Sequence, residues 1–463
     1  MSKISKRQLL ITILFISISI IFSQSIWAQK KVDRDELSEF ITAKVYQPDF
    51  PAADCNYHSL IYATDGKIYF SLSTHNTDYG ARLFRFDPHT RKIVLLGKMD
   101  EATGENITRQ FSQGKIHTRL FEHQGKLWFA THTSFYQGGL PGIDYRERLP
   151  FPGGHFISYD LWTGQFEDRA RIFPNEGIIS MTLDRENDIL YGLTWPSGVL
   201  VSYELDKNDL RYWGAVQRQG EWGTHPWNWE RICRTPAIDP KGNVYGSTMD
   251  GGIWKYDRTK NRRVSYIEGL DLSRVPFAQS AEENLKGDFH NNWRTIEWNP
   301  LTNSFWGIHF ECSTLFEFDP AKSFIRSVTE LRPTALLGSV RNPMISQLGF
   351  TIGPDNTIYY LAHGPGVDIE GRPEIPSNVY LITYDIDRGV YTDRGPILTA
   401  DDRRVFFTES IAFGDGDNIY TAAWVEVNDP ERVKAIYADR KEGAPDETKE
   451  LVYEMLLVQF TKN

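Results

Sequence analysis

The chain has 463 residues, of which 40% are hydrophobic and 24% are charged. This balance is that of a folded chain, and it excludes a disordered protein or a polytopic membrane protein. The 61 Asp and Glu outnumber the 51 Lys and Arg, and a net charge of -10 argues against a nucleic-acid partner. The aromatic share of 13% favours strands, because flat side chains pack well on a pleated surface.

Residues 1–28 have the order of a secretory signal peptide. Three basic residues precede an apolar run over residues 9–22, and a stretch rich in small residues ends at Ala28. The run is shorter than the about 20 residues that a membrane-spanning helix needs. We therefore expect cleavage after residue 28, a mature chain over 29–463 without a membrane span, and a secreted or periplasmic location. An uncleaved anchor is the alternative.

The three cysteines, Cys55, Cys233 and Cys312, all lie in the expected mature chain. An odd number excludes a complete disulfide framework, so the stability of the fold must come from packing. We expect each of them to be a buried, small, apolar side chain.

One pattern recurs along the mature chain: an apolar strand, a turn with Asp, Gly or Asn, an aromatic strand, and a strand ending in Tyr-Asp or Phe-Asp. The turn and the aromatic strand recur over residues 65–70, 124–129, 187–192, 241–246, 302–307, 355–360 and 417–421. Copies at about 50–60 residues of spacing are typical of a propeller, in which single sheets stack around an axis. The sequence thus predicts an all-β, seven-bladed β-propeller of four-stranded antiparallel blades, as one domain over 29–463, with a helical insertion over 429–450.

Polar and aromatic side chains recur where these strands begin and end. In a propeller, first strands begin and second strands end on the same face, so these positions share one rim. The second strands are expected to end at His75, His132, Trp195, Asp250, His309, His363 and Trp424. The first strands are expected to begin near His58, His117 and Arg119, Ser180, Arg234, Arg294, Gln347 and Glu409. A longer loop in the second blade leads from Phe135 to His155.

Imidazole and guanidinium groups on one rim of an acidic chain indicate an anionic ligand, because Arg holds carboxylate or sulfate with two parallel hydrogen bonds. The alternative is a polar channel that only binds water. Indole rings on or near the rim could stack against sugar rings or pack between blades: Trp195, Trp227, Trp229, Trp293 and Trp424.

The segment 117–133, HTRLFEHQGKLWFATHT, followed by PGGHFISYD over 152–160, resembles the propeller-fold polysaccharide lyases. It is most similar to the seven-bladed ulvan lyases and more distantly similar to the oligogalacturonate lyases. The resemblance implies cleavage of a uronate-containing, sulfated, ulvan-like glycan. Ulvan lyases use a His pair with a Tyr and an Arg, and His132 and His155 match the His pair. Arg234 and Tyr136 are the nearest candidates for the other two roles.

A lyase of this kind removes the proton next to a uronate carboxylate and expels the sugar oxygen. Donors aimed at the carboxylate stabilise the charge that grows in the transition state, and His suits the proton transfer because it titrates near neutral pH. We expect His132 and His155 to serve proton transfer or carboxylate neutralisation, with Arg234 or Arg294 holding the acid group. The expected substrate contacts are His58, His75, Arg119, Trp195, Asp250 and Trp424.

Two other classes of function stay open. A metal-dependent hydrolase or lactonase would hold a divalent ion on His309, Gln347 and His363, a set similar to the His/Gln metal cluster of oligogalacturonate lyases. A propeller that binds glycans without cleaving them is the third class. An assay with and without chelator separates the first two, and binding without product indicates the third. We expect an anionic polysaccharide as partner, no organic cofactor and a monomeric protein.

Overall fold

The structure is a computed structural model, and it describes part of the chain. The described residues are 30–31, 40–105, 109–134, 150–221, 230–260, 263–276, 290–311, 313–337, 347–372, 374–440 and 452–462. None of the helices in these ranges has the length and hydropathy needed to cross a bilayer.

Five separate four-stranded antiparallel sheets follow one another along the chain, each with its strands in sequence order. The first contains β3 (Leu60–Tyr62), β4 (Ile68–Leu72), β5 (Arg82–Asp87) and β6 (Lys92–Lys98). The second contains β7 (Phe121–His123), β8 (Lys126–Ala130), β9 (His155–Asp160) and β10 (Phe166–Arg171). The third contains β11 (Gly177–Asp184), β12 (Ile189–Trp195), β13 (Val199–Glu204) and β14 (Asp209–Ala215).

The fourth sheet contains β15 (Ala237–Ile238), β16 (Val244–Ser247), β17 (Ile253–Tyr256) and β18 (Val264–Tyr266). The fifth contains β19 (Trp293–Asn299), β20 (Ser304–His309), β21 (Thr314–Asp319) and β22 (Phe324–Glu330). Short 3-10 turns η3 (Leu272–Arg274) and η4 (Thr334–Leu336) follow these two sheets, and helix α2 (Met99–Thr103) follows the first.

A nine-stranded sheet holds the rest of the strands except one short pair. One antiparallel run comprises β23 (Phe350–Ile352), β24 (Thr357–Gly364), β26 (Asn378–Asp385) and β27 (Val390–Thr399). The other comprises β28 (Val405–Thr408), β29 (Ala412–Phe413), β30 (Asn418–Glu426), β31 (Tyr453–Thr461) and β2 (Ile41–Tyr46). The separate pair is β1 (Lys30–Lys31) with β25 (Val367–Asp368).

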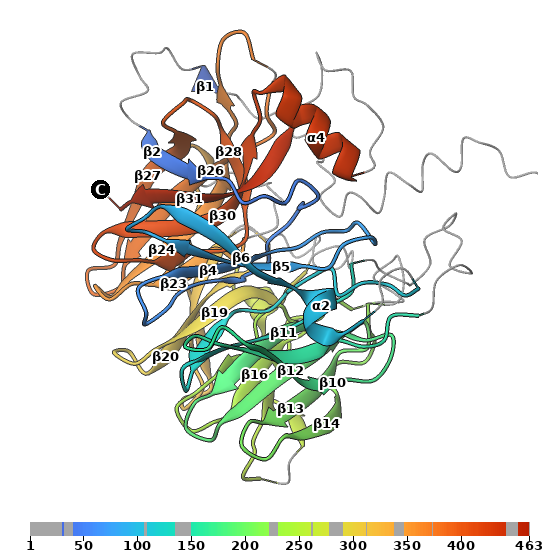
Figure 1. Cartoon of the computed structure of the whole chain (residues 1–463). Coiled ribbons are helices and arrows are strands. Elements are labelled where there is room, and N and C mark those ends of the chain that lie inside the picture. The colour runs from blue at the N-terminus through green and yellow to red at the C-terminus, as the bar shows by residue number, and fades with distance from the viewer. Residues whose placement is uncertain are drawn as a thin grey trace, which may run out of the picture.

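Strand β2, from the start of the described chain, completes the sheet that the last strand of the chain also belongs to. It pairs antiparallel with β31, where Lys44 lies opposite Gln459, and parallel with β27, where Ile41 lies opposite Ile397. Figure 1 shows the blue β2 beside the orange and red strands. The sequence pattern does not predict β2, because this strand has no neighbouring turn and lies outside the repeat.

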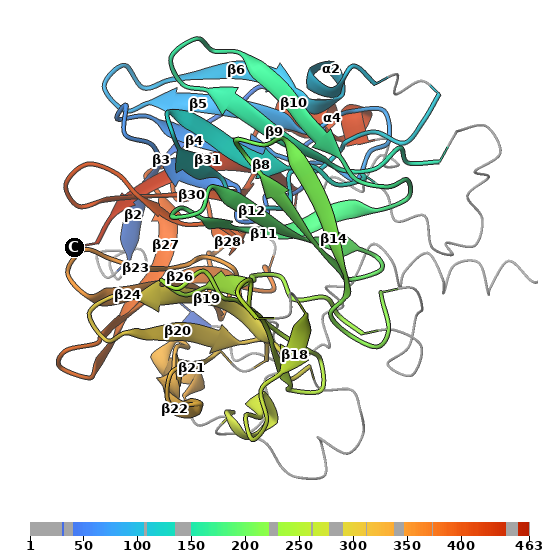
Figure 2. The ribbon, with the colours of Figure 1, turned by 90° about the horizontal axis from the view of Figure 1, so that it is seen from below.

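The hydrophobic core lies between consecutive sheets. Strand β4 is buried at every position because its sheet is covered on both faces, whereas much of the outermost strand β6 is exposed. In the interface between the first two sheets, Tyr69 and Leu83 pack with Leu127 and Ile157. In Figure 2 the sheets succeed one another around the molecule from blue through green and yellow to orange. This mostly-β arrangement of four-stranded antiparallel sheets is consistent with a propeller, which confirms the predicted fold class at that level.

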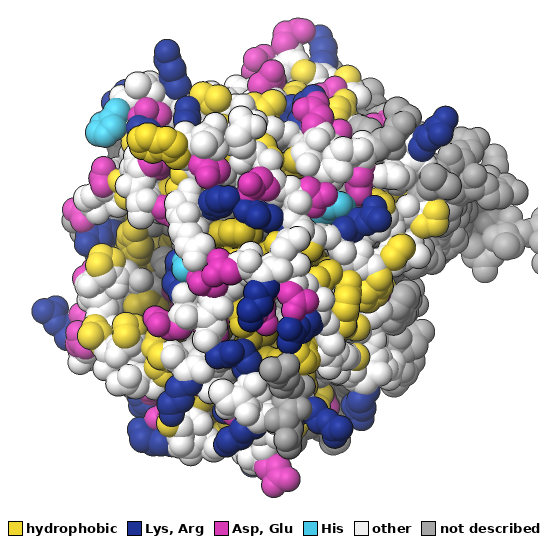
Figure 3. Space-filling model, turned by 60° about the horizontal axis from the view of Figure 1, so that its bottom comes forward, with side chains coloured by type: hydrophobic (Ala, Val, Ile, Leu, Met, Phe, Trp, Pro, Cys, Tyr) yellow, Lys and Arg dark blue, Asp and Glu magenta, His cyan; other side chains and the backbone are white. Residues whose placement is uncertain are grey.

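Helix α4 (Pro430–Arg440) lies between β30 and β31, inside the range predicted to be a helical insertion. The rest of that range lies outside the described residues. On the face drawn in Figure 3, basic and acidic side chains are intermingled, so the negative net charge of the chain is not gathered there.

Candidate functional site

The predicted rim positions occupy equivalent places in successive sheets. Trp195 and His309 are the last residues of the second strands β12 and β20, and His132 follows the second strand β8 by two residues. The backbones of His132 and Lys115 pair in an isolated bridge, with N–O distances of 2.8 and 3.0 Å. This pairing brings the end of a second strand next to the segment that leads into the first strand of the same sheet.

Four aromatic rings lie in contact along this rim. Tyr57 stacks on His117 with ring centroids 4.1 Å apart and an interplanar angle of 16°. His117 meets His132 edge to face at 5.8 Å, and His132 meets Trp195 at 5.3 Å. The four rings come from three sheets and form a continuous row, and we call this set the imidazole row.

The two imidazoles of the row are held in the neutral form. Burial lowers the pKa of His117 well below its usual value, and the nearby cations Arg234 and Lys115 lower it further. Burial also lowers the pKa of His132, and Lys115, His117 and Arg234 add to the effect. Both causes act against the charged form of an imidazole. His132 is fully buried, so its ring is a neutral base surrounded by positive charge.

Arg234 is paired with the carboxylate of Glu221, which also accepts a hydrogen bond from an indole. Its Nη1 lies 3.0 Å from Oε1 of Glu221, and Nε1 of Trp195 donates to Glu221 Oε2 at 2.6 Å. Burial alone would raise the pKa of Glu221, but the charges of Arg234 and Arg231, with hydrogen bonds from Arg234 and the backbone of Ile232, together outweigh burial and keep the pKa below its usual value. Glu221 therefore connects a cation to the aromatic end of the imidazole row.

A second cationic group lies around His58. Arg294 pairs with the buried carboxylate of Glu409, and Arg119 approaches His58 Nε2 through its Nε at 3.3 Å. Arg119 also pairs with Glu297 at 3.0 Å. Burial, then Arg119 and Arg294, lower the pKa of His58 well below its usual value. His58 is thus another buried neutral imidazole beside guanidinium groups.

Arg119 also borders a cavity of about 620 Å³ beside the first strands of four sheets. Glu297 and Asp184 line it as well, so its wall carries both signs of charge. Arg119 therefore contacts the His58 group and this cavity.

His155 has the opposite environment. Its Nδ1 lies 2.8 Å from Asp168 Oδ1 and its Nε2 lies 3.0 Å from Glu105 Oε1. Burial would lower the pKa of His155, but hydrogen bonds to Asp168 and Glu105 outweigh burial and raise it. The backbone of His155 bonds to Thr131, the residue before His132, so the two histidines are joined through the backbone. The side chain of His155, by contrast, bridges the carboxylates of Asp168 and Glu105.

The three predicted metal ligands lie at the expected strand ends. His309 ends β20, with Nδ1 3.0 Å from the carbonyl oxygen of Glu311, and burial lowers its pKa to about 4. Burial and then Arg294 lower the pKa of His363, at the end of β24, to about 3. Gln347 is buried just before β23. Neutral imidazoles suit a metal ligand, and a shared ion on these three residues stays a prediction.

The predicted substrate contacts at the edge of the rim are more exposed. The side chain of His75 is 44% exposed and pairs with Asp54 at 3.0 Å, and that of Asp250 is 63% exposed. Trp424 stacks on Tyr453 at 4.2 Å and donates its Nε1 to the carbonyl oxygen of Asp54. Asp250 and His75 can meet a ligand directly, and one face of the Trp424 ring is already covered.

The other aromatic candidates divide into two groups. Trp293 is fully buried and donates its Nε1 to the carbonyl oxygen of Thr235 at 2.8 Å, so it packs between sheets and does not present a face to a sugar. The predicted Tyr136 and the indoles Trp227 and Trp229 lie outside the described residues.

The sequence pattern does not identify several charged residues of the rim. Lys115 lies two residues before His117, on the same face of an extended segment, and that spacing is a signal that could have identified it. Glu311 lies two residues after the predicted rim residue His309, which is the same kind of signal, whereas Glu221 lies in a segment without a repeat pattern. Burial raises the pKa of Glu311 to about 7, which makes it a carboxyl group able to exchange a proton near neutral pH.

Comparison with known proteins gives similarity to solved structures alone. No family model matches the chain, and no curated protein matches it. A Lactobacillus plantarum protein is 10% identical with a TM-score of 0.49, covering 86% of this chain and 99% of its own. An oligogalacturonate lyase in complex with manganese is 10% identical with a TM-score of 0.48, and the match covers 91% of this chain and 96% of the lyase chain. A 6-phosphogluconolactonase candidate from Bacteroides fragilis is 11% identical with a TM-score of 0.48, covering 84% and 94%. This similarity is too low to support any inference about function.

Proposed function

We propose that this protein is a seven-bladed propeller that cleaves a uronate-containing polysaccharide by β-elimination. The observation that carries the proposal is the imidazole row, in which two neutral histidines lie beside Lys115 and Arg234. β-Elimination needs a base for the proton next to the carboxylate and positive charge to stabilise the anion that forms. The row supplies the base, and Lys115 and Arg234 beside it supply the positive charge.

In the proposed reaction, His132 accepts the proton from the carbon next to the uronate carboxylate. The electron pair of that bond forms the new carbon–carbon double bond, and the bond to the glycosidic oxygen breaks. An acid returns a proton to the leaving oxygen, and Tyr136 is the residue that the sequence offers for this step. Arg234 or Arg294 binds the substrate carboxylate. The substrate then competes with the protein carboxylates that pair with these residues, Glu221 at Arg234 and Glu409 at Arg294.

His155 is a positioning residue in this proposal. Its raised pKa favours the imidazolium, which is a poor acceptor for the substrate proton. Asp168 and Glu105 already bind both of its ring nitrogens. We therefore propose that His155 holds in place the segment that carries His132.

Access to His132 requires a rearrangement, because its ring is fully buried. The exposed His75 and the partly exposed Arg119 offer the first contacts for an anionic chain. We propose that substrate binding uncovers the imidazole row, as closing and opening steps do in many enzymes.

The test is a panel of uronate-containing glycans with ulvan first, because the second-blade segment resembles ulvan lyases. A lyase produces unsaturated sugar ends, which absorb in the ultraviolet as a conjugated double bond. Unsaturated ends from one glycan support the proposal. Saturated ends indicate a hydrolase, and binding of a glycan without any product indicates a binding protein. Secretion is tested by the N-terminus of the exported protein, which we expect near Gln29.

A metal-dependent hydrolase or lactonase is the second candidate, and one observation favours it. Within the described part of the chain, Nε2 of His363 is buried without a hydrogen-bond partner. A buried imidazole nitrogen in that state is suited to a metal ion. Loss of hydrolysis after chelation, with saturated products, would support this candidate.

A further inference from the structure

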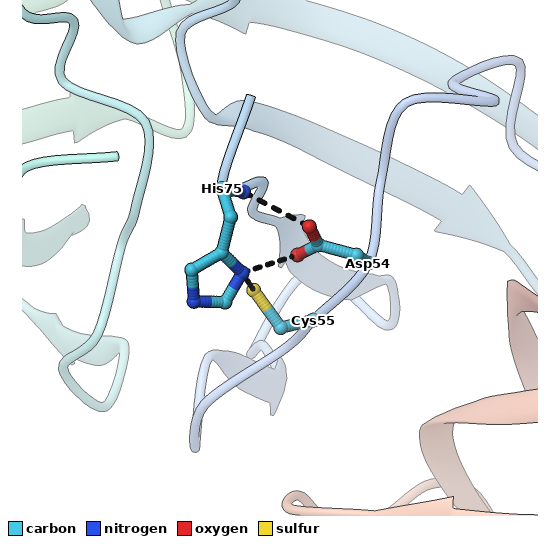
Figure 4. A group of neighbouring side chains, drawn as sticks. All are labelled: Asp54, Cys55 and His75. Atoms are coloured by element: carbon cyan, nitrogen blue, oxygen red, sulfur yellow. Dashed lines mark hydrogen bonds and ion pairs between the residues drawn. The ribbon is translucent and has the colours of Figure 1, made fainter. Parts of the chain in front are cut away.

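Three side chains that can bind metals converge at the edge of the first sheet. Asp54 and Cys55 precede β3, and His75 follows β4. The backbones of Cys55 and Ser73 pair in an isolated bridge, which fixes the two segments side by side. Figure 4 shows the carboxylate of Asp54 and the sulfur of Cys55 on the same side of the His75 ring.

Both side chains approach the same ring nitrogen. Nδ1 of His75 lies 3.0 Å from Asp54 Oδ1 and 4.0 Å from Cys55 Sγ, and the three donor atoms lie within 4.8 Å of one another. Ligands at about 2.0–2.3 Å from one tetrahedral ion are roughly 3.5 Å apart. The two observed distances bracket this value, so small side-chain movements would place all three donors around one ion.

The same geometry argues against a nucleophilic cysteine. A Cys–His–Asp relay needs the thiol at one imidazole nitrogen and the carboxylate at the other. Here both lie at Nδ1 of His75, and the thiol is buried. All three donor atoms thus lie on one side of the His75 ring, as the ligands of a single ion must.

The donor set selects the class of metal. Sulfur and imidazole ligands favour Zn²⁺-type ions over Mg²⁺ or Ca²⁺, which prefer oxygen. On binding, the thiol of Cys55 releases its proton to solvent, and the thiolate and Asp54 together balance a divalent charge. Without an ion, burial and then Asp54 raise the pKa of the Cys55 thiol well above its usual value, and Lys115 opposes them only in part, so the charge of the ion is needed to form the thiolate.

We propose that Asp54, Cys55 and His75 bind one Zn²⁺-type ion with an open coordination position. Three protein ligands leave a place for water or a ligand, as in catalytic rather than structural zinc sites. The exposed side of His75 gives that place access to solvent. The site is separate from His309, Gln347 and His363, and it does not depend on the proposed lyase activity.

The experiment uses the whole mature chain without an affinity tag, stripped of metal with a chelator and titrated with Zn²⁺ in a calorimeter. We expect a Zn²⁺ site whose affinity falls in Cys55→Ser and in His75→Ala by at least the 10–100-fold typical for loss of a supporting partner. Co²⁺ is the second probe, because a thiolate ligand gives Co²⁺ a charge-transfer absorption that oxygen and nitrogen ligands do not. That band should be present in the unsubstituted chain and absent in Cys55→Ser.

Two variants serve as matched controls. Cys233→Ser changes another buried thiol, and His123→Ala removes another histidine paired with an aspartate. Both should bind Zn²⁺ as the unsubstituted chain does. His75→Ala keeps the test valid if Cys55→Ser does not fold, because His75 is exposed. Absence of stoichiometric Zn²⁺ binding, or equal binding by His75→Ala, would overturn the proposal.

Discussion

His132 and His155 lie next to each other on the backbone of the second sheet, and their environments are opposite in charge. His132 has an aromatic ring on either side and the cations Lys115 and Arg234 nearby, so its imidazole stays neutral. His155 lies between two carboxylates, so its imidazolium is favoured. Two histidines that the sequence suggests as a matched pair are therefore suited to different tasks.

The difference shows that neighbouring charges, and not position along a strand, decide the protonation state of a buried histidine. Both side chains are buried, and burial alone would lower both pKa values. Only hydrogen bonds to carboxylates reverse the direction at His155. The comparison can be tested by removing each histidine and then the groups around it.

The largest expected effect is on catalysis at His132. His132→Ala should lower the rate of glycan cleavage by about 10²–10⁴, because loss of a general base typically has this effect. Steady-state kinetics on the glycan identified in the panel measures it. His123→Ala, which removes a histidine paired with Asp188, is the control and should keep its activity. A normal rate in a folded His132→Ala protein would show that His132 is not the base.

The next effect is on stability at His155. His155→Gln should lower the free energy of unfolding by about 2 kcal/mol at acidic pH, because it removes a charged hydrogen-bond donor from two carboxylates. Because folding raises the pKa of His155, the protonated ring stabilises the folded protein, and this stabilisation is fully present below the unfolded-state pKa of about 6.5. That contribution is lost as the pH rises through the folded pKa.

Urea unfolding of both proteins at about pH 5.5 and about pH 8.5, on either side of the ordinary histidine pKa, measures this dependence. The difference between the two proteins should shrink at the higher pH. A difference that grows with pH would mean that His155 is neutral in the folded protein.

A smaller effect is expected from moving His132 without removing it. A Cβ atom at Gly177 would lie 1.9 Å from Nδ1 of His132, so the ring of His132 must shift in Gly177→Ala. Because misplacement by about 1 Å can lower a rate up to 10²-fold, we expect a loss of about tenfold in kcat. Gly192→Ala in the same sheet is the control, since its nearest contact would be a side-chain carbon of Ile178 at 3.1 Å. Equal kcat values for both variants would show that the position of the ring does not matter.

The smallest effect is a shift in the pH profile. Lys115→Met removes a cation that lowers the pKa of His132, so that pKa should rise. The acid limb of kcat/KM should then move to higher pH by up to about one unit. Lys67→Met, which removes a lysine paired with Asp87 near the surface, should leave the profile unchanged. A shift to lower pH in Lys115→Met would contradict the proposed electrostatics.

Much of the fold is predictable because the repeat is local. Each turn and aromatic strand carries its own pattern, so successive sheets and the position of α4 follow from the sequence. Strand β2 is not predictable in this way, since its pairing with β27 and β31 depends on residues several hundred positions away. The repeat shows where a sheet begins, but it does not show which distant segment completes it.

The convergence of side chains at the strand ends is predictable, and their charge environment is less so. The strand ends do bring His117, His132 and Trp195 together. The partners that set their charge, such as Glu221 at Arg234 and Asp168 at His155, come from loops and outer strands. Their contacts depend on side-chain packing in three dimensions, which one sequence does not specify.

The pairing of β2 with β31 has a consequence for how the chain folds. Tyr46 donates its hydroxyl proton to Gln459 across 413 residues of sequence. Closing a loop of that size carries an entropic cost of about 5 kcal/mol by the logarithmic estimate. During synthesis, β2 emerges long before β31 and stays without this partner until the last strand is complete. We therefore expect slow, late assembly of the final sheet, and we expect removal of either β2 or β31 to destabilise this same sheet.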